Sequence, residues 1–297
     1  MEDVNNRSDI RDFLATRRAR LTPGQVGLPT GGSRRRVPGL RREEVAVLAG
    51  VSTEWYTRLE KGHISGVSDE VLEAVARALQ LDGAERVYLF ELARAARPAA
   101  RTAPRRRRSE VPPRVLWMLD SMTGSAAFVC NGRLDILAAN ALARALYSPV
   151  FTGGGAPANI ARYQFLDPGA HDYYPDWDGA ADVTVALLRT EAGRDPHNQE
   201  LRHLVGDLST LSEEFRARWA THNVRIHTAG TKQFNHPVVG PLKLAYHSVD
   251  LSADDAGPLA LTIYTAEPGS GSEDRLRLLA SWAATHQPEQ ARTEAPR

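Results

Sequence analysis

The chain has 297 residues, which is long for one domain and typical of two. Its composition is 42% hydrophobic and 25% charged, and no apolar run approaches the roughly 20 residues that cross a bilayer, which excludes a membrane-spanning protein. The single cysteine excludes an internal disulfide. Because the first residues show no apolar segment typical of a secretory signal, the expected compartment is the cytoplasm.

The net charge of +1 conceals an asymmetry between the two halves. Residues 1–108 carry 21 Lys and Arg against 14 Asp and Glu, a net charge of +7. Residues 109–297 carry 16 against 22, a net charge of −6. A basic module joined to an acidic one is expected when only one half contacts a polyanion.

A stretch rich in proline and arginine separates the halves. Residues 97–113 show no apolar periodicity, which predicts an extended, charged linker. We therefore expect a first domain over residues 1–96, the linker, a second domain over 114–284 and a disordered tail over 285–297.

Helical periodicity runs through the first domain. Leu72, Val75, Ala76 and Leu79 fall at i, i+3, i+4 and i+7, which places them on one face of a helix. Shorter apolar stripes predict four more helices, over residues 10–21, 45–49, 56–59 and 82–93. The predicted first domain is therefore an all-α module of five helices.

Residues 42–61 satisfy the physical demands of a helix-turn-helix. Ala46 is small where the two helices cross, Gly50 can form the turn, and Ser52 can cap the second helix. Apolar residues that can hold the helices together are Val45, Ala49, Val51, Tyr56 and Leu59. The alternative is an ordinary αα-corner that binds no nucleic acid.

A second helix placed in the major groove presents its N-terminal and outward side chains to the bases. Arg58 can donate two hydrogen bonds to guanine, and Glu54 can accept one from cytosine. Trp55 can contact the DNA backbone or pack beside the first helix, and we favour packing. The expected base contacts are Thr53, Glu54, Thr57 and Arg58, and the expected phosphate contacts are Arg42, Ser52 and Lys61. Arg34, Arg35 and Arg36 can also reach DNA, or belong to a mobile surface loop.

Strand patterns appear after the linker. Residues 126–139 predict two strands around an Asn131-Gly132 turn, and residues 140–220 are mostly helical. Further strands are predicted over 223–228, 231–235, 242–249 and 259–265, before a last helix that contains Leu276 and Leu279. This order predicts an α+β domain with one antiparallel sheet, whose first hairpin is separated in sequence from its last three strands, and with helices over one face.

Two regions resemble a known family. Residues 40–93 are similar to the N-terminal domain of lambda-repressor-like (Xre-type) transcriptional regulators. Phrases in the second half resemble the MmyB-like subgroup: LAANALARALYSP (137–149), FLDP (165–168), LRTEAGRDP (188–196), HPVVG (236–240) and YTAEPGSGSEDRLRLLASWA (264–283). The resemblance implies a DNA-binding regulator with a PAS-like C-terminal domain that, in some members, holds a small apolar ligand such as a fatty acid.

A ligand cup between sheet and helices needs an apolar lining and a few polar anchors. The aromatic candidates are Phe128, Tyr147, Tyr163, Phe165, Trp177, Trp219, Phe234 and Tyr246, within a wider set that includes Tyr173, Tyr174 and Tyr264. Candidate anchors for a carboxylate are Arg162, Lys232 and His236. The alternative is that the aromatics form the core and the polar residues are surface or structural groups.

Motifs for catalysis are missing from the sequence. No His-Glu-x-x-His or Cys-x-x-Cys pattern occurs, and the glycines at 153–155 lack the Lys-Ser/Thr of a phosphate loop. We expect no catalytic residue, no metal and no cofactor. The leading hypothesis is a DNA-binding regulator, acting as a homodimer, whose second domain senses a small hydrophobic ligand. The alternative second domain is a protein-interaction or dimerisation module, and an enzyme with a DNA-targeting domain has the least support.

Overall fold

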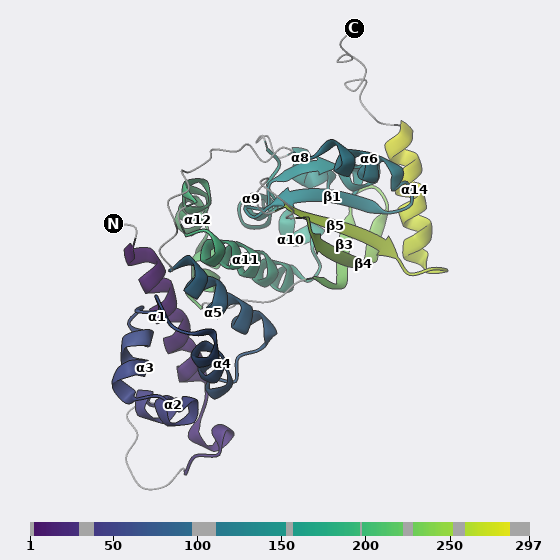
Figure 1. Ribbon diagram of the computed structural model, residues 1–297. Helices are drawn as coiled ribbons and strands as arrows, with labels where there is room; N and C mark the ends of the chain where they lie inside the picture. The colour runs from purple at the N-terminus through teal and green to yellow at the C-terminus, as the bar shows by residue number, and fades with distance from the viewer. Residues whose placement is uncertain are drawn as a thin grey trace. The chain divides into compact units, whose positions relative to one another are not determined.

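The computed structural model describes residues 3–29, 39–96, 111–152, 157–196, 198–221, 228–251 and 259–285 (Figure 1). The chain divides into two compact units. The first comprises Met1–Pro104 and Val185–Ile226, and the second comprises Arg105–Thr184 and His227–Arg297. Helix α11 (Trp177–Arg194) therefore begins in the second unit and ends in the first.

The first unit is helical in its described part. Its N-terminal elements are α1 (Asp3–Arg20), the short 3-10 helix η1 (Pro23–Val26), α2 (Arg42–Ala49), α3 (Thr53–Glu60), α4 (Asp69–Ala78) and α5 (Gly83–Ala95). The predicted stripe of Leu72, Val75, Ala76 and Leu79 is buried in the common core. Asp82 and Glu85 form a capping box, in which the Glu85 amide donates to Asp82 Oδ1 over 2.8 Å. The predicted all-α fold with five helices before the linker is confirmed.

The later helices of the first unit are the end of α11, α12 (Gln199–Leu211) and α13 (Glu213–Ala220). Arg189 of α11 is 1% exposed, and its Cζ lies 4.0 Å from the centroid of the Trp219 ring. Gly193 faces Tyr88 of α5 so closely that an added Cβ would lie 2.4 Å from the tyrosine ring. The end of α11 therefore packs against α5, although the sequence places this helix after the first strands of the second domain.

One five-stranded sheet organises the second unit. Its strands are β1 (Ala126–Asn131), β2 (Ile136–Ala139), β3 (Ala229–His236), β4 (Gly240–Asp250) and β5 (Leu259–Ala266). All neighbours are antiparallel, in the order β2-β1-β5-β4-β3. The predicted α+β fold is confirmed, because the first hairpin joins the last three strands through the β1–β5 pairing.

The helices of the second unit cover the sheet. They are α6 (Pro113–Ser121), α7 (Ala141–Leu146), α8 (Ser148–Thr152), α9 (Ile160–Leu166), α10 (Ala170–Tyr173), the start of α11 and α14 (Gly271–Thr285). Alternate residues of a strand point to opposite faces, so Val129 and Leu261 pack with Val115 and Leu119 of α6. Phe128 and Tyr264, from the same two strands, contact each other on the other face, where Phe128 also meets Tyr147. The sequence did not predict α6, and the expectation of helices over one face of the sheet is wrong, because α6 packs on the face opposite Phe128 and Tyr147.

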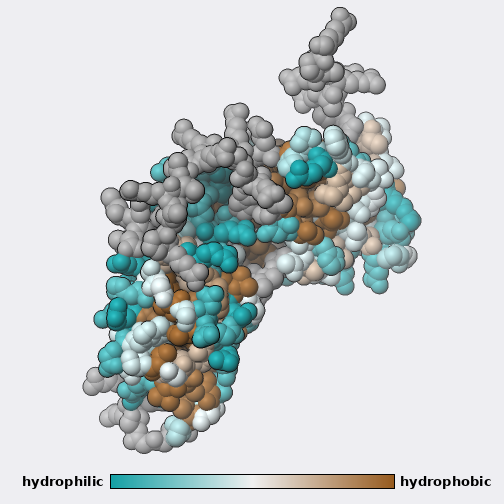
Figure 2. Space-filling model, viewed as in Figure 1, coloured by the Kyte–Doolittle hydropathy of each residue, from teal (hydrophilic) through white to brown (hydrophobic). Residues whose placement is uncertain are grey.

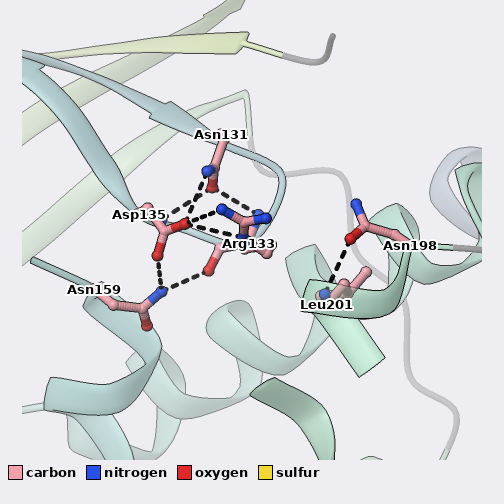
Figure 3. A network of polar contacts seen from close by, with 6 residues as sticks. All are labelled: Asn131, Arg133, Asp135, Asn159, Asn198 and Leu201. Atoms are coloured by element: carbon pink, nitrogen blue, oxygen red, sulfur yellow. Dashed lines mark hydrogen bonds and ion pairs between the residues drawn. The ribbon is translucent and has the colours of Figure 1, made fainter. Parts of the chain in front are cut away.

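The first hairpin differs from the predicted Asn-Gly turn. Its left-handed residue is Leu134, with φ 65°, rather than Gly132. Figure 3 shows the reason: Asn131 Oδ1 accepts hydrogen bonds from the amides of Arg133 and Asp135, while Asp135 accepts from Asn131, Arg133 and Asn159. The polar side chains thus set a longer turn.

Several predictions fall on residues that the structure does not describe. Residues 222–227 contain most of the predicted strand over 223–228. Most of the predicted linker, over 97–110, and the tail, over 286–297, also lie outside the described residues.

Candidate nucleic-acid interface and ligand site

The helix-turn-helix is formed by α2 and α3. Gly50 takes φ 67°, the left-handed conformation that the turn requires and that glycine adopts without strain. The side chains predicted to join the two helices are buried (Val45, Ala46, Ala49, Tyr56 and Leu59), and Val51 packs against the same core. Ser52 Oγ accepts a hydrogen bond from the Trp55 amide over 3.1 Å and so caps α3.

The opposite side of α3 faces solvent. Thr53, Glu54 and Arg58 are exposed, and Thr57 is partly exposed. Lys61, directly after the helix, is exposed as well. Trp55 packs against the core, as favoured from the sequence. The four residues expected to contact bases are therefore accessible on one helix whose other face is held by the core.

Arg42 makes a contact that sequence reasoning missed. Its Nε donates to Oε1 of Glu60 over 2.9 Å. Glu60 is 1% exposed and also accepts from Arg18 of α1, over 2.8 Å from Nε and 2.9 Å from NH2. One buried carboxylate thus joins α1, α2 and α3. Glu60 follows the apolar Leu59 in sequence, and nothing in the periodicity marks it as buried.

Electrostatics decide the charge of this buried carboxylate. Burial alone would raise the pKa of Glu60, but hydrogen bonds from Arg18 and the charge of Arg42 outweigh burial and hold that pKa below its ordinary value. Glu60 is therefore ionised at neutral pH. The Arg42 side chain remains 48% exposed, so it can meet a phosphate while it is fixed by Glu60. Arg34, Arg35 and Arg36 lie outside the described residues.

In the second unit, aromatic side chains from the sheet and from the helices form one cluster. Phe234 of β3 is fully buried, and its ring centroid lies 5.8 Å from Tyr147 and 5.6 Å from Tyr264. The hydroxyls of Tyr147 and Tyr264 lie 2.7 Å apart in a hydrogen bond. The other members are Phe128, Tyr163, Tyr173, Tyr174 and Tyr246.

The remaining aromatic candidates lie apart from this cluster. Phe165 and Trp177 pack together with centroids 5.8 Å apart, and Trp177 also stacks on His171 at 4.1 Å. Trp219 belongs to the first unit, where it contacts Arg189 and Phe215. Both arrangements give these side chains partners of their own.

The polar candidates differ in what they can offer a ligand. His236 is buried, and both of its ring nitrogens are engaged with backbone: Nε2 with the Ala145 carbonyl at 2.9 Å and Nδ1 with the Val238 amide at 3.2 Å. Arg162 is exposed on α9. Lys232 lies beside the aromatic cluster, with Nζ 4.3 Å from the centroid of the Tyr174 ring. Lys232 therefore presents a charged group to the cluster.

In the described part of the chain, no group of three or more His, Cys, Asp or Glu is arranged to hold a metal ion. No described helix is both long and apolar enough to cross a membrane. Cys130 is buried in β1, and burial raises the pKa of its thiol to about 12, so it stays protonated at neutral pH.

Comparison with known proteins gave two family matches. Residues 111–279, more than half of the chain, match a model described as an MmyB-like transcription regulator ligand binding domain. Residues 9–89 match a model described as a helix-turn-helix domain. No curated protein matched the chain. The first match contains the aromatic cluster, and the second contains α2 and α3.

Proposed function

Because the chain belongs to the MmyB-like transcription regulators, we propose that α3 reads a specific DNA sequence and that an apolar small molecule in the C-terminal half controls this binding. The observation that carries the first part is the exposure of Thr53, Glu54 and Arg58 on a helix whose other face is buried. Such a helix can enter the major groove without unfolding its own core.

Electrostatics support contact with DNA. Residues 1–108 carry the net charge of +7, which attracts the DNA phosphates. Residues 109–297 carry a net charge of −6 and therefore add no nonspecific attraction to DNA. Arg42, Ser52 and Lys61 flank the exposed face of α3 and are our proposed phosphate contacts. Of these, Ser52 caps α3 through its side chain, so its contact with phosphate is the weakest of the three proposals.

The aromatic cluster supports the second part of the proposal. Ligand sites in proteins are mostly apolar with a few polar groups that fix orientation. The cluster joins β1, β3 and β5 through ring contacts to α9, to α10 and to Tyr147, the residue that follows α7, and Lys232 lies beside it. Occupation by an apolar molecule would change the free energy of the whole sheet-and-helix packing, and DNA binding would respond if the bound and free states differ in DNA affinity.

Selection of bound duplexes from random DNA tests the DNA-binding function directly. The full chain should enrich one sequence motif, and a homodimer should enrich two copies of a half-site about one helical turn apart. The E54A/R58A double variant should lose the motif and keep weak, salt-dependent binding to any DNA. Enrichment of the same motif by wild type and double variant would show that α3 is not the reading helix.

Exposed apolar residues favour a second candidate for the C-terminal half. Trp117 and Leu116 of α6 are 71% and 40% exposed, and hydrophobic residues are visible among hydrophilic ones on the surface of both units (Figure 2). A helix of this kind fits a protein-interaction or dimerisation module that needs no small molecule. Sedimentation of wild type and W117A tests whether α6 forms the dimer contact. If W117A no longer self-associates but still binds a ligand, α6 serves dimerisation alone.

The division of function along the chain is also part of the proposal. We assign DNA binding to residues 1–96, connection to 97–113 and ligand response to 114–284, with no catalytic role. Limited proteolysis of the full chain tests the assignment, since first cleavage is expected within 97–113.

A further inference from the structure

Lysine is rare in this chain. Of the 37 Lys and Arg residues, three are lysines (Lys61, Lys232 and Lys243) and the other 34 are arginines. An arginine side chain stays charged in proteins, whereas a lysine can lose its proton and become a nucleophilic amine. Lys61 and Lys243 are exposed, but Lys232 of β3 is partly buried. Lys232 therefore differs from both other lysines in its surroundings.

The Lys232 amine lies against aromatic rings. In the register of β3 with β4, Lys232 and Phe234 pair with the buried Leu244 and Leu242, so their side chains lie on the same face of the sheet. The Nζ atom lies 4.3 Å from the centroid of the Tyr174 ring and 5.6 Å from that of Phe234. In the part of the chain that the structure describes, no carboxylate pairs with this amine. Its surroundings are ring faces without a counter-charge.

These surroundings make Lys232 a reactive amine. Burial lowers its pKa to about 8, and no charged group of the described residues offsets this effect. At pH 7 about 10% of an amine with that pKa is neutral, against about 0.04% of an amine with the ordinary lysine pKa of about 10.4. The neutral form attacks carbonyl carbons, and enzymes that form Schiff bases activate lysine in the same way. Lys232 thus offers far more of the reactive form than an ordinary exposed lysine.

The Tyr174 hydroxyl is a buried donor without an acceptor. Tyr174 is 1% exposed, and its hydroxyl has no hydrogen-bond partner among the described residues. The neighbouring hydroxyls are satisfied, because Tyr147 and Tyr264 bond to each other and Tyr173 donates to the Leu146 carbonyl. Burial raises the pKa of Tyr174 well above its ordinary value, so the hydroxyl keeps its proton at neutral pH. A carbonyl oxygen brought to the amine would give this donor an acceptor.

The ring faces determine which carbonyl chemistry suits the site. Condensation of an amine with an aldehyde gives an imine, and protonation of that imine gives an iminium ion with one positive charge on the same nitrogen. Aromatic faces attract cations, so the Tyr174 and Phe234 rings stabilise an iminium as they stabilise the ammonium. Acylation would instead give an uncharged amide, which loses this attraction. The arrangement therefore favours an aldehyde over an acyl donor.

We propose that Lys232 condenses with an uncharged aldehyde and holds it as an imine over the Tyr174 and Phe234 rings. The amine attacks the carbonyl carbon, and the two hydrogens of the amine leave with the carbonyl oxygen as water while the C=N bond forms. The step consumes no oxidant or reductant, and hydrolysis reverses it. Lys232 is partly exposed, so an aldehyde can approach it from solvent. The inference goes beyond the proposed function, since this capture requires neither DNA nor a noncovalent ligand.

Reductive trapping of the full chain with butanal tests the inference. Cyanoborohydride converts each imine into a stable secondary amine, and peptide mass spectrometry then locates the butyl groups. At pH 7 Lys232 should be alkylated about 10- to 100-fold faster than the exposed Lys243, because more of its amine is neutral. This comparison of two lysines within the wild-type chain needs no variant, so it does not depend on the folding of a mutant.

Three variants assign the parts of the site. K232R keeps the positive charge but cannot condense, so it should lose the adduct at this position while Lys61 reacts as before. K243R makes the same change at an exposed lysine and should leave the Lys232 rate as in wild type. Y174F keeps the ring and removes the hydroxyl, and it should slow alkylation of Lys232 about 2- to 12-fold through the loss of one hydrogen bond.

The outcomes separate this inference from the function proposed above. Equal alkylation rates at Lys232 and Lys243, or alkylation of Lys243 and Lys61 alone, would overturn the capture of an aldehyde by Lys232. An unchanged rate in Y174F would overturn the part of the Tyr174 hydroxyl. Selection of bound duplexes from random DNA, repeated with K232R, should still enrich the wild-type motif, so failure of the trapping experiment leaves the DNA-binding function standing.

Discussion

The two candidate sites place their residues in opposite ways. On α3, the residues proposed to read DNA are exposed, and a separate set of buried residues holds the helix. In the aromatic cluster, the rings proposed to contact a ligand are themselves the buried core, as with Phe234 and Tyr147. Recognition and stability are therefore carried by different side chains in the first case and by the same side chains in the second.

This difference determines what mutations can reveal. A substitution on the exposed face of α3 should alter DNA binding and leave the free energy of unfolding nearly unchanged. A substitution in the aromatic cluster should alter stability first and ligand binding together with it. Lys232 and Tyr174, which contact each other beside the cluster, carry polar groups that a substitution can remove with little change in packing.

The largest effect is expected at Glu60. Glu60→Ala leaves Arg18 and Arg42 without their shared buried carboxylate, and breaking a buried ion pair destabilises by about 3–5 kcal/mol. Urea unfolding followed by circular dichroism measures the loss. Glu54→Ala, on the exposed side of the same helix, is the control and should change stability by less than about 0.5 kcal/mol. Equal losses in both variants would contradict the division of α3 into two faces.

A similar loss is expected from Phe234→Ala. The Phe234 ring is fully buried. The centroids of four tyrosine rings lie 5.5 to 5.9 Å from its own centroid. Truncation should destabilise the second unit by about 3 kcal/mol, measured by the same unfolding experiment. Val238→Ala, at a half-exposed position nearby in sequence, is the control. A loss below about 1 kcal/mol would mean that the cluster is not core.

Gly193→Ala tests whether the end of α11 packs against α5 in solution. The new Cβ would meet the Tyr88 ring at 2.4 Å, so we expect destabilisation of about 1–3 kcal/mol from overpacking. Gly206→Ala, in α12 with open space around it, should be neutral or slightly stabilising through helix propensity. If both variants gain stability, the end of α11 does not pack against α5 as described.

The DNA-binding variants Arg58→Ala and Arg42→Ala should differ in kind. Arg58→Ala should relax specificity at one base position by about 1–3 kcal/mol, with stability unchanged. Arg42→Ala should weaken binding to every sequence and lower the salt slope by about one, and it should also reduce stability through the lost bond to Glu60. Fluorescence anisotropy with selected and random duplexes over a salt series measures both. Equal losses on both duplexes for Arg58→Ala would exclude it from base reading.

The smallest predicted effect concerns pH. Burial raises the pKa of Asp9 to about 6, against an opposing effect of Arg189. Because the folded pKa lies above the unfolded one, stability from protonated Asp9 is full below about pH 4 and is lost as pH rises through about 6. Asp9→Asn should flatten this pH dependence and raise the free energy of unfolding at pH 7. An identical pH profile in wild type and variant would contradict it.

The sequence predicted most of what depends on local pattern. Helical periodicity identified the buried stripe of α4, and the spacing around Gly50 identified the helix-turn-helix, because both follow from backbone geometry. Strand alternation predicted β4 and β5 to within a few residues, and the order of strands and helices predicted the α+β class.

Features that depend on packing between distant segments were not predictable. Glu60 is buried because Arg18 and Arg42 meet it from two other helices, and that meeting has no local signature. Trp219 was predicted from the sequence to line the ligand site, yet it packs in the first unit against Arg189. Aromatic residues carry no sequence mark that separates a cavity wall from a solid core, so the cluster emerged only from three-dimensional contacts.

Native mass spectrometry of the purified full chain, combined with its DNA affinity before and after organic extraction, tests the central claim most directly. The account predicts one small apolar molecule bound per chain, and a change in DNA affinity of about 5- to 150-fold once it is removed. The account would be contradicted if the protein has the mass of the chain alone and its DNA affinity is the same before and after extraction. A ligand would then not control DNA binding.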